Sequence, residues 1–179
     1  QKKHFVEKLM KQKGDPLWQL SKISPDGSSY TDLSKSSYIL GMNGLNECVK
    51  RITGQELHES TDAYKTGMKL ISSMYLKCQE LSKEHGVKVT LEESPAESAS
   101  YRLAKVDLMN FAEAKDYVIG DKTNCYYTNS IHYRADAPVS IVERIQGQSK
   151  FHPLIESGAI VHAFVGDQKP NPKAIESLV

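Results

Sequence analysis

Short apolar runs alternate along this chain with longer stretches whose apolar residues recur at helical spacing. This alternation is typical of strand-to-helix units, and it predicts an α/β architecture with a largely parallel sheet. The length of 179 residues is ordinary for one globular domain. The expected strands lie at residues 38–42, 87–91, 126–133 and 159–165, and the first is expected to be buried.

The helices are predicted from apolar spacing and from residues that start or stop helices. The clearest one carries Tyr64, Met68, Ile71, Tyr75 and Cys78 at intervals of three and four residues. Five other helices are expected. The first ends near Gly14, and the second runs from Asn43 to Gly54 with Leu45, Cys48, Val49 and Ile52 on one face. The remaining three run from Ser94 to about Val106, begin at Pro138, and begin at Asn171-Pro172.

The most specific local chemistry lies where the strand at residues 87–91 passes into a helix. Ser94 and Glu97 have the spacing of a capping box, and Pro95 suits the first helical position. Backbone N–H groups at such a start point outward, with the positive end of the helix dipole behind them, so an anion could bind there. A capped helix start that binds nothing remains the alternative, and nearby carboxylates weigh against phosphate.

A second group of polar residues lies at the other strand-to-helix turn and in the β-rich run before Pro138. These candidates for a pocket are Asn43, Asn46, Glu47, Asn129, Ser130 and His132. Ligands gather at strand-to-helix turns in α/β folds. Helix capping for the asparagines, and a hydrogen-bonded core position for the histidine, remain the alternatives.

Charge and composition exclude several classes of partner. The 23 basic and 22 acidic residues give a net charge of +1 without a single-sign block, so neither nucleic acid nor membrane is an expected partner. The chain has no apolar run near 20 residues in length and no pattern of a signal peptide, which predicts a cytoplasmic protein.

Metal and disulfide chemistry are not expected from the cysteines and histidines. Cys48, Cys78 and Cys125 are too far apart for paired zinc ligands and too few for a disulfide framework, so buried reduced thiols are expected. His152 and His162 lack the spacing of metal ligands. The chain opens at Gln1 within a helical pattern and closes barely two turns after Asn171, so residues 1–179 are interpreted as one segment of a longer protein.

Four motifs in order give the chain a resemblance to a known family. They are Ser37 to Glu47 with Thr53-Gly54, Leu91 to Glu97, Tyr127 to His132, and Phe151 to Leu154. Together they resemble the anaerobic, class III, glycyl-radical ribonucleoside triphosphate reductases. The resemblance implies a ten-stranded α/β barrel, of which this chain would be a part from the C-terminal half. It also implies conversion of ribonucleotides to deoxyribonucleotides by radical chemistry, for DNA replication.

By this resemblance, the turn after residue 91 receives the substrate phosphate. The implied substrate-binding residues are Ser94, Ala96, Glu97, Ser98 and Ala99, and the family usually has threonine at the position of Ser94 and often glycine at that of Ser98. The family's finger-loop cysteine belongs upstream and its radical glycine and zinc-binding cysteines belong downstream. No catalytic residue is therefore expected here, and the chain alone is expected to be inactive.

The resemblance also implies cofactors and partners for the parent enzyme. These are a ribonucleoside triphosphate substrate, the rest of the barrel, a glycyl radical installed by an iron-sulfur and S-adenosylmethionine activase, zinc in a C-terminal region outside this chain, and a second subunit in a homodimer. The nucleotide-sensing N-terminal domain also lies outside it. Two alternatives remain: a radical-free nucleotide-binding or interaction domain, and a piece of another glycyl-radical enzyme such as an acyl lyase.

Overall fold

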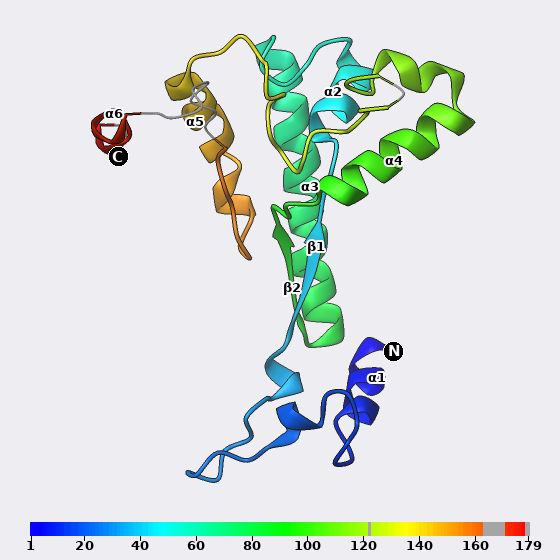
Figure 1. Ribbon diagram of the computed structural model, residues 1–179, viewed down its shortest axis with the longest axis vertical. Coiled ribbons are helices and arrows are strands. Elements are labelled where there is room, and N and C mark those ends of the chain that lie inside the picture. Colours follow the sequence, from blue (N-terminus) through cyan, green and yellow to red (C-terminus); the bar gives the residue numbers. More distant parts are fainter. Residues whose placement is uncertain (122, 163–170, 178–179) are drawn as a thin grey trace. The chain divides into compact units, whose positions relative to one another are not determined.

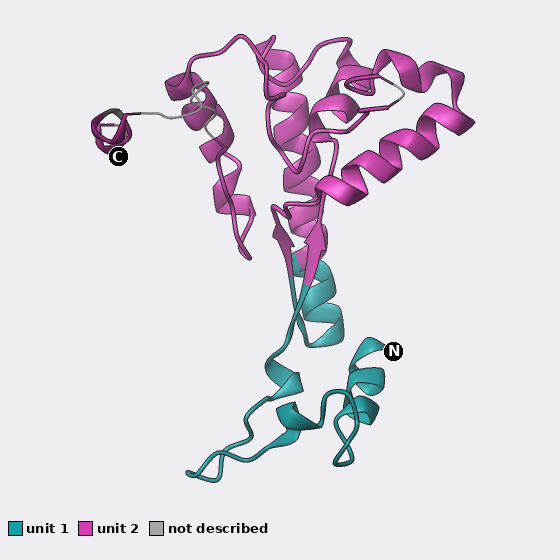
Figure 2. Cartoon of the chain, in the orientation of Figure 1, with its two compact units in different colours: residues 1–38, 79–89 teal, residues 39–78, 90–179 magenta. Residues whose placement is uncertain are grey.

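The computed structural model describes residues 1–121, 123–162 and 171–177, which form a mixture of helices with a small sheet. The α-helices are α1 (Lys2–Leu9), α2 (Leu45–Thr53), α3 (Thr61–His85), α4 (Glu97–Asn110), α5 (Ile141–Ser149) and α6 (Pro172–Glu176), and the 3₁₀ helices are η1 (Trp18–Ser21), η2 (Leu33–Lys35), η3 (Ala112–Asp116) and η4 (His152–Leu154). The chain divides into two compact units, residues 1–38 with 79–89 and residues 39–78 with 90–179 (Figure 2).

The sheet contains two strands, β1 (Ser37–Gly41) and β2 (Lys88–Glu92), which pair as parallel neighbours (Figure 1). The expected α/β character is confirmed at this coarse level. Four strands were expected, and the described residues contain only these two. Of the other two expected strands, one does not form, and the other is absent where its residues are described.

The first of these, residues 126–133, does not continue as a strand because its residues pair with two different partners. Tyr126 forms an antiparallel bridge with Ile119, and Asn129 forms another with Asn43. Between these bridges and the end of the run, Ser130 adopts a left-handed backbone with φ of 48°, a conformation that ends an extended segment.

The second, expected at residues 159–165, has no strand at residues 159–162, and the remainder lies outside the described residues. The chain just before it nevertheless runs along β2. Ser157 N–H donates to Leu91 O at 3.1 Å, and Glu93 N–H donates to Gly158 O at 3.0 Å. The segment that pairs with the end of β2 thus lies just before the predicted strand, and the prediction is wrong at residues 159–162.

Burial differs sharply between the two strands. In β2, Thr90 and Leu91 are almost completely buried, as the alternation predicted for Leu91. In β1, the expected strand is confirmed but the expected burial is wrong, since Ile39 and Leu40 are 49% and 44% exposed. No described element covers these two side chains.

The expected long helix is confirmed as α3, and the predicted end of α2 at Gly54 is confirmed by its left-handed φ of 80°. The expected cap of α6 is confirmed by Lys173 N–H, which donates to Asn171 Oδ1 at 3.0 Å. The first helix ends at Leu9 rather than near Gly14.

Two predicted helix starts are wrong. Gly44, with φ of 78°, precedes α2 without a side-chain cap, so Asn43 does not cap that helix. Helix α5 begins after Ser140 rather than at Pro138, because Ser140 and Glu143 form a complete capping box. Two residues of the predicted buried face of α2 are also exposed: Ile52, which is 60% exposed, and Cys48.

The core of the larger unit forms around α3. Its most buried apolar side chains are Val49, Leu57, Ala63, Ile71, Leu91, Ile131 and Phe151. Tyr64 contacts Phe151 edge to face, and its hydroxyl donates to Gly147 O at 2.7 Å. Helix α3 approaches Leu57 closely at Gly67, where an added Cβ would lie 2.5 Å from Leu57 Cδ2.

Local hydrogen bonds organise the smaller unit. In the turn at residues 24–29, Asp26 Oδ1 accepts from the backbone N–H and the hydroxyl of Ser28. At the other end of the unit, Ser82 Oγ accepts from Val89 N–H at 2.9 Å. None of the helices in the described ranges is long and apolar enough to cross a membrane.

Candidate functional site

The turn between β2 and α4 leaves backbone donors without partners. The first helical hydrogen bond is from Ser100 N–H to Ala96 O at 2.8 Å, and Ala96 provides no side-chain cap. Within the described part of the chain, the backbone N–H groups of residues 97–99 make no hydrogen bond. These groups and the helix dipole make this helix start favourable for an anion.

The capping box predicted for Ser94 and Glu97 is wrong. Ser94 Oγ donates to Glu92 Oε2 at 3.2 Å instead. The helix begins at Glu97, two residues after the expected first helical residue Pro95, and continues to Asn110. The end of β1 packs directly on this hydroxyl, since a Cβ added to Gly41 would lie 2.6 Å from Ser94 Oγ. Tertiary contact therefore holds Ser94 away from the helix start.

The five predicted substrate-binding residues all lie in this turn or in the first turn of α4. Glu97 and Ser98 are exposed, and Ser94, Ala96 and Ala99 are half-buried. Ser98 is helical and has no positive φ, so the conformational freedom of glycine is not required at this position. These residues lie together because they are neighbours in the sequence, and their role in binding substrate stays a prediction.

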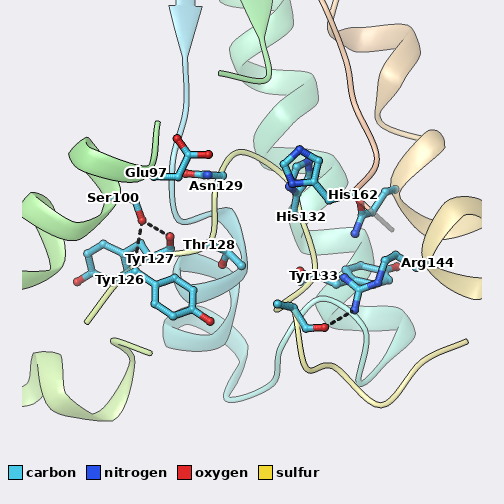
Figure 3. Close-up of a pocket in the computed structure, with 12 residues that line it drawn as sticks. Glu97, Ser100, Tyr126, Tyr127, Thr128, Asn129, His132, Tyr133, Arg144 and His162 are labelled. Atoms are coloured by element: carbon cyan, nitrogen blue, oxygen red, sulfur yellow. Dashed lines mark hydrogen bonds between the residues drawn. The ribbon is translucent and has the colours of Figure 1, made fainter. Parts of the chain in front are cut away.

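A cavity of about 400 Å³ lies beside the start of α4 (Figure 3). Glu97 and Ser100 line it from α4, and Asn129 and His132 line it from the loop after Tyr127. Arg144, Gln148 and His162 also line it. Ser100 fixes the loop to the helix, since its hydroxyl hydrogen-bonds to Tyr127 O and accepts from Tyr127 N–H at 3.1 Å.

The six predicted pocket residues lie on two chain segments that pair with each other. Asn43 and Asn129 form an antiparallel bridge, and Ser130 N–H donates to Met42 O at 3.1 Å. Asn129 and His132 line the 400 Å³ cavity, whereas Asn43 and Glu47 line a separate cavity of about 530 Å³. The sequence thus identified two adjacent sites as one.

Glu47 and Asn46 have internal hydrogen-bond partners. The carboxylate of Glu47 accepts from the backbone N–H of Thr128 at 3.1 Å, from the Thr128 hydroxyl, and from Asn46 Nδ2 at 3.1 Å. Asn46 Oδ1 accepts from Leu57 N–H at 3.1 Å. Burial raises the pKa of Glu47, and the hydrogen bonds from Thr128 act in the opposite direction. Glu47 therefore joins α2 to the loop at Thr128, and Asn46 joins α2 to the chain at Leu57. Neither residue lines the 400 Å³ cavity.

Glu93 was not predicted as a functional residue, yet its carboxylate is fully buried at the edge of the site. Its Oε2 lies 2.9 Å from His132 Nε2 and accepts from Ile160 N–H at 3.2 Å. Its Oε1 lies 3.6 Å from His152 Nε2. The alternation along β2 could have predicted the burial of Glu93, since residue 93 continues the buried face of Val89 and Leu91.

Arg144 and Gln148 were also missed, because they lie on the buried face of α5. Arg144 donates to the carbonyl groups of Tyr133, Arg134 and Ala135 at 3.0–3.2 Å. Burial lowers the pKa of this guanidinium, but arginine keeps its charge in proteins. Gln148 is 1% exposed, and its Oε1 has no hydrogen-bond partner in the part of the chain that the structure describes. The cavity wall therefore combines a buried cation with an unpaired buried acceptor.

The three cysteines lie apart and are reduced. Cys78 and Cys125 are buried as expected, whereas Cys48 is exposed, contrary to the expectation. Among residues 1–121, 123–162 and 171–177, no group of three or more histidine, cysteine or acidic side chains could hold a metal ion.

The fold and site define a segment of an α/β protein with a cavity beside a strand-to-helix turn, a usual place for ligands. The family model for anaerobic ribonucleoside-triphosphate reductase matches residues 1–179. The chain belongs to this family, as the sequence motifs predicted.

Three curated relatives carry the name anaerobic ribonucleoside-triphosphate reductase. The protein of Enterobacteria phage T4 is 26% identical over 144 residues, which cover 80% of this chain and 22% of the relative. The Salmonella typhimurium protein is 25% identical over 158 residues, with coverage of 88% and 22%. The Escherichia coli protein is 23% identical over 145 residues, with coverage of 80% and 20%. The chain thus spans about a fifth of the length of these relatives.

Proposed function

We propose that the full-length protein reduces ribonucleoside triphosphates to deoxyribonucleotides by radical chemistry, and that this segment binds the substrate phosphate. One observation carries the phosphate assignment: the backbone N–H groups of residues 97–99 have no partner among the described residues, at a helix start beside a cavity. Charged hydrogen-bond acceptors bind such groups well, and a phosphate offers several of them.

We assign the remaining architecture to the same enzyme. Strands β1 and β2 would form part of the wall of a ten-stranded α/β barrel, in which neighbouring strands would cover Ile39 and Leu40. These side chains are exposed in this chain, and strands of a parallel sheet are normally covered on both faces. The parent would act as a homodimer together with its activase.

The residues of this segment do not fit the cofactors that the parent requires. The glycyl radical and the zinc ion need a radical glycine and clustered cysteines, whereas Cys48, Cys78 and Cys125 lie apart. Both groups would be held by regions outside this chain. The role proposed for this segment is therefore binding and orientation of the substrate rather than radical transfer.

The phosphate assignment is tested by removing one N–H group without removing the helix. Proline is tolerated in the first turn of a helix, so Ser98→Pro deletes one donor, and Ser98→Ala is the matched control that keeps it. A hydrogen bond to a charged group contributes about 1.5–3 kcal/mol, which corresponds to roughly 10- to 100-fold in affinity. We expect calorimetry on the full-length protein to show this loss of cytidine triphosphate affinity for Ser98→Pro only. Equal affinities for the two variants would refute the assignment.

A further inference from the structure

The buried carboxylate of Glu93 joins three chain segments at the edge of the 400 Å³ cavity. Its Oε2 contacts His132 Nε2 at 2.9 Å and the Ile160 N–H group at 3.2 Å. Its Oε1 faces His152 Nε2 at 3.6 Å. The side chain has no exposed surface, so within the described part of the chain its charge is met by these polar groups rather than by solvent.

The contacts of His132 determine where its proton lies. Two oxygen atoms face Nε2, since Ile160 O lies 3.0 Å from it and Glu93 Oε2 lies 2.9 Å from it. An unprotonated Nε2 would direct its lone pair at the Ile160 carbonyl oxygen, so Nε2 must carry the proton. Glu93 Oε2 also accepts from the Ile160 N–H group, so this oxygen is an acceptor in both contacts. With the proton on Nε2, the neutral form of the ring has its lone pair on Nδ1.

The ring of His132 also lines the cavity (Figure 3). Its Nδ1 atom makes no hydrogen bond with any of the described residues. The His162 ring lies beside it, with centroids 5.0 Å apart and planes at 55°, and limits how far the imidazole can turn. The first residue of α4, Glu97, lines the same cavity.

We infer that Glu93 is a positioning residue that fixes the His132 tautomer, so that Nδ1 accepts a hydrogen bond from a hydroxyl group of the bound ligand. A neutral acceptor suits a hydroxyl and disfavours an anionic oxygen, whereas the start of α4 suits the anion. The two groups together select a phosphorylated sugar with a free hydroxyl group. This step rests on the proposed function, because that function places the phosphate at residues 97–99.

The substitution His132→Gln distinguishes the contribution of His132 to stability from its contribution to ligand binding. The amide nitrogen of the glutamine can replace Nε2–H as a donor to Glu93 and Ile160. Its amide oxygen is bonded to Cδ, one bond farther along the side chain than Nδ1 of histidine, so it does not occupy the place of Nδ1. The full-length wild-type protein, His132→Gln and His132→Ala are compared by urea unfolding and by calorimetric titration with cytidine triphosphate, cytidine and inorganic triphosphate. Inorganic triphosphate has no sugar hydroxyl, and cytidine has no phosphate.

We expect His132→Gln to unfold at a higher urea concentration than His132→Ala, and to lose roughly 3- to 10-fold in affinity for cytidine and cytidine triphosphate. Its affinity for inorganic triphosphate should stay at the wild-type value. Wild-type cytidine affinity in His132→Gln would overturn the inference, and so would an equal loss for inorganic triphosphate. The phosphate turn is tested separately by triphosphate binding to the wild type, and loss of cytidine affinity supports the role of His132 whatever that result is.

Two substitutions of Glu93 test its positioning role. Glu93→Gln keeps an oxygen that accepts from His132 Nε2, so cytidine affinity should remain close to that of the wild type. Glu93→Leu removes the acceptor, so the cytidine affinity should fall as it does in His132→Gln. Wild-type cytidine affinity in a folded Glu93→Leu protein would overturn the role of Glu93.

Discussion

The close packing of Gly67 against Leu57 predicts how the substitution Gly67→Ala changes the stability of the larger unit. In an exposed helix, Gly→Ala stabilises by about 1 kcal/mol. Here the added Cβ would lie 2.5 Å from Leu57 Cδ2, and Leu57 is 1% exposed, so the leucine cannot move into solvent. Overpacking a core costs about 1–3 kcal/mol. The two effects together predict that Gly67→Ala destabilises the protein by about 0–2 kcal/mol.

The clash can be isolated by a double-mutant cycle with Leu57→Ala. That substitution alone should cost about 2–5 kcal/mol, because it leaves a cavity. In the double variant the Cβ added at position 67 enters the vacated space, and the helix keeps its gain of about 1 kcal/mol. The double variant should therefore be more stable than Leu57→Ala, with a coupling energy of about 1–3 kcal/mol in favour of the pair.

Pulse proteolysis in urea measures these stabilities at protein concentrations low enough to limit self-association. The wild type, both single variants and the double variant are compared under the same conditions. Additive effects, with Gly67→Ala stabilising by about 1 kcal/mol, would refute the close approach of α3 to Leu57.

Three further predictions follow from caps, burial and exposed strands. Ser140→Ala should cost about 0.5–2 kcal/mol by urea unfolding, whereas Ser94→Ala should lose no cap energy, and equal cap losses would contradict the two geometries. Burial raises the pKa of Glu47 above its ordinary value of 4.5; the folded state thus keeps this proton to a higher pH than the unfolded chain, and stability should fall as the pH rises from about 4.5 through the raised pKa. Glu47→Gln should flatten that part of the dependence of stability on pH. An unchanged dependence would contradict the raised pKa of Glu47. The 179-residue chain should self-associate in light scattering, because Ile39 and Leu40 are exposed on a strand with an unpaired edge, and a clean monomer would contradict this.

Local sequence patterns predicted the elements whose structure depends on local chemistry. Helix α3 follows its apolar spacing, and α2 ends at Gly54 because glycine adopts a left-handed conformation there. The burial of Val89 and Leu91 follows strand alternation. The family resemblance also came from motifs that are contiguous in sequence.

The two capping patterns show that a local sequence motif does not by itself determine whether a capping box forms. Ser94 and Ser140 each have a glutamate three residues later, yet only Ser140 forms the capping box. The difference comes from outside the motif, because Gly41 packs against Ser94 and Glu92 accepts the hydrogen bond of its hydroxyl. No local pattern distinguishes the two cases.

The buried contacts around the candidate site could not be predicted from the sequence. The turn at residues 94–99 was expected to bind an anion, whereas the Glu93 contacts depend on residues far away in the chain. His132 and Ile160 lie 39 and 67 residues from Glu93. Such pairings arise when the chain folds back on the sheet, and neither periodicity nor composition specifies them.

Hydrogen exchange at the start of α4 tests the central assignment most directly. In the full-length protein, the amide groups of residues 97–99 should exchange quickly without ligand, since none of the described residues binds them, and slowly with saturating cytidine triphosphate. Unchanged exchange at these amides, at a concentration where calorimetry shows the nucleotide to be bound, would contradict the phosphate turn.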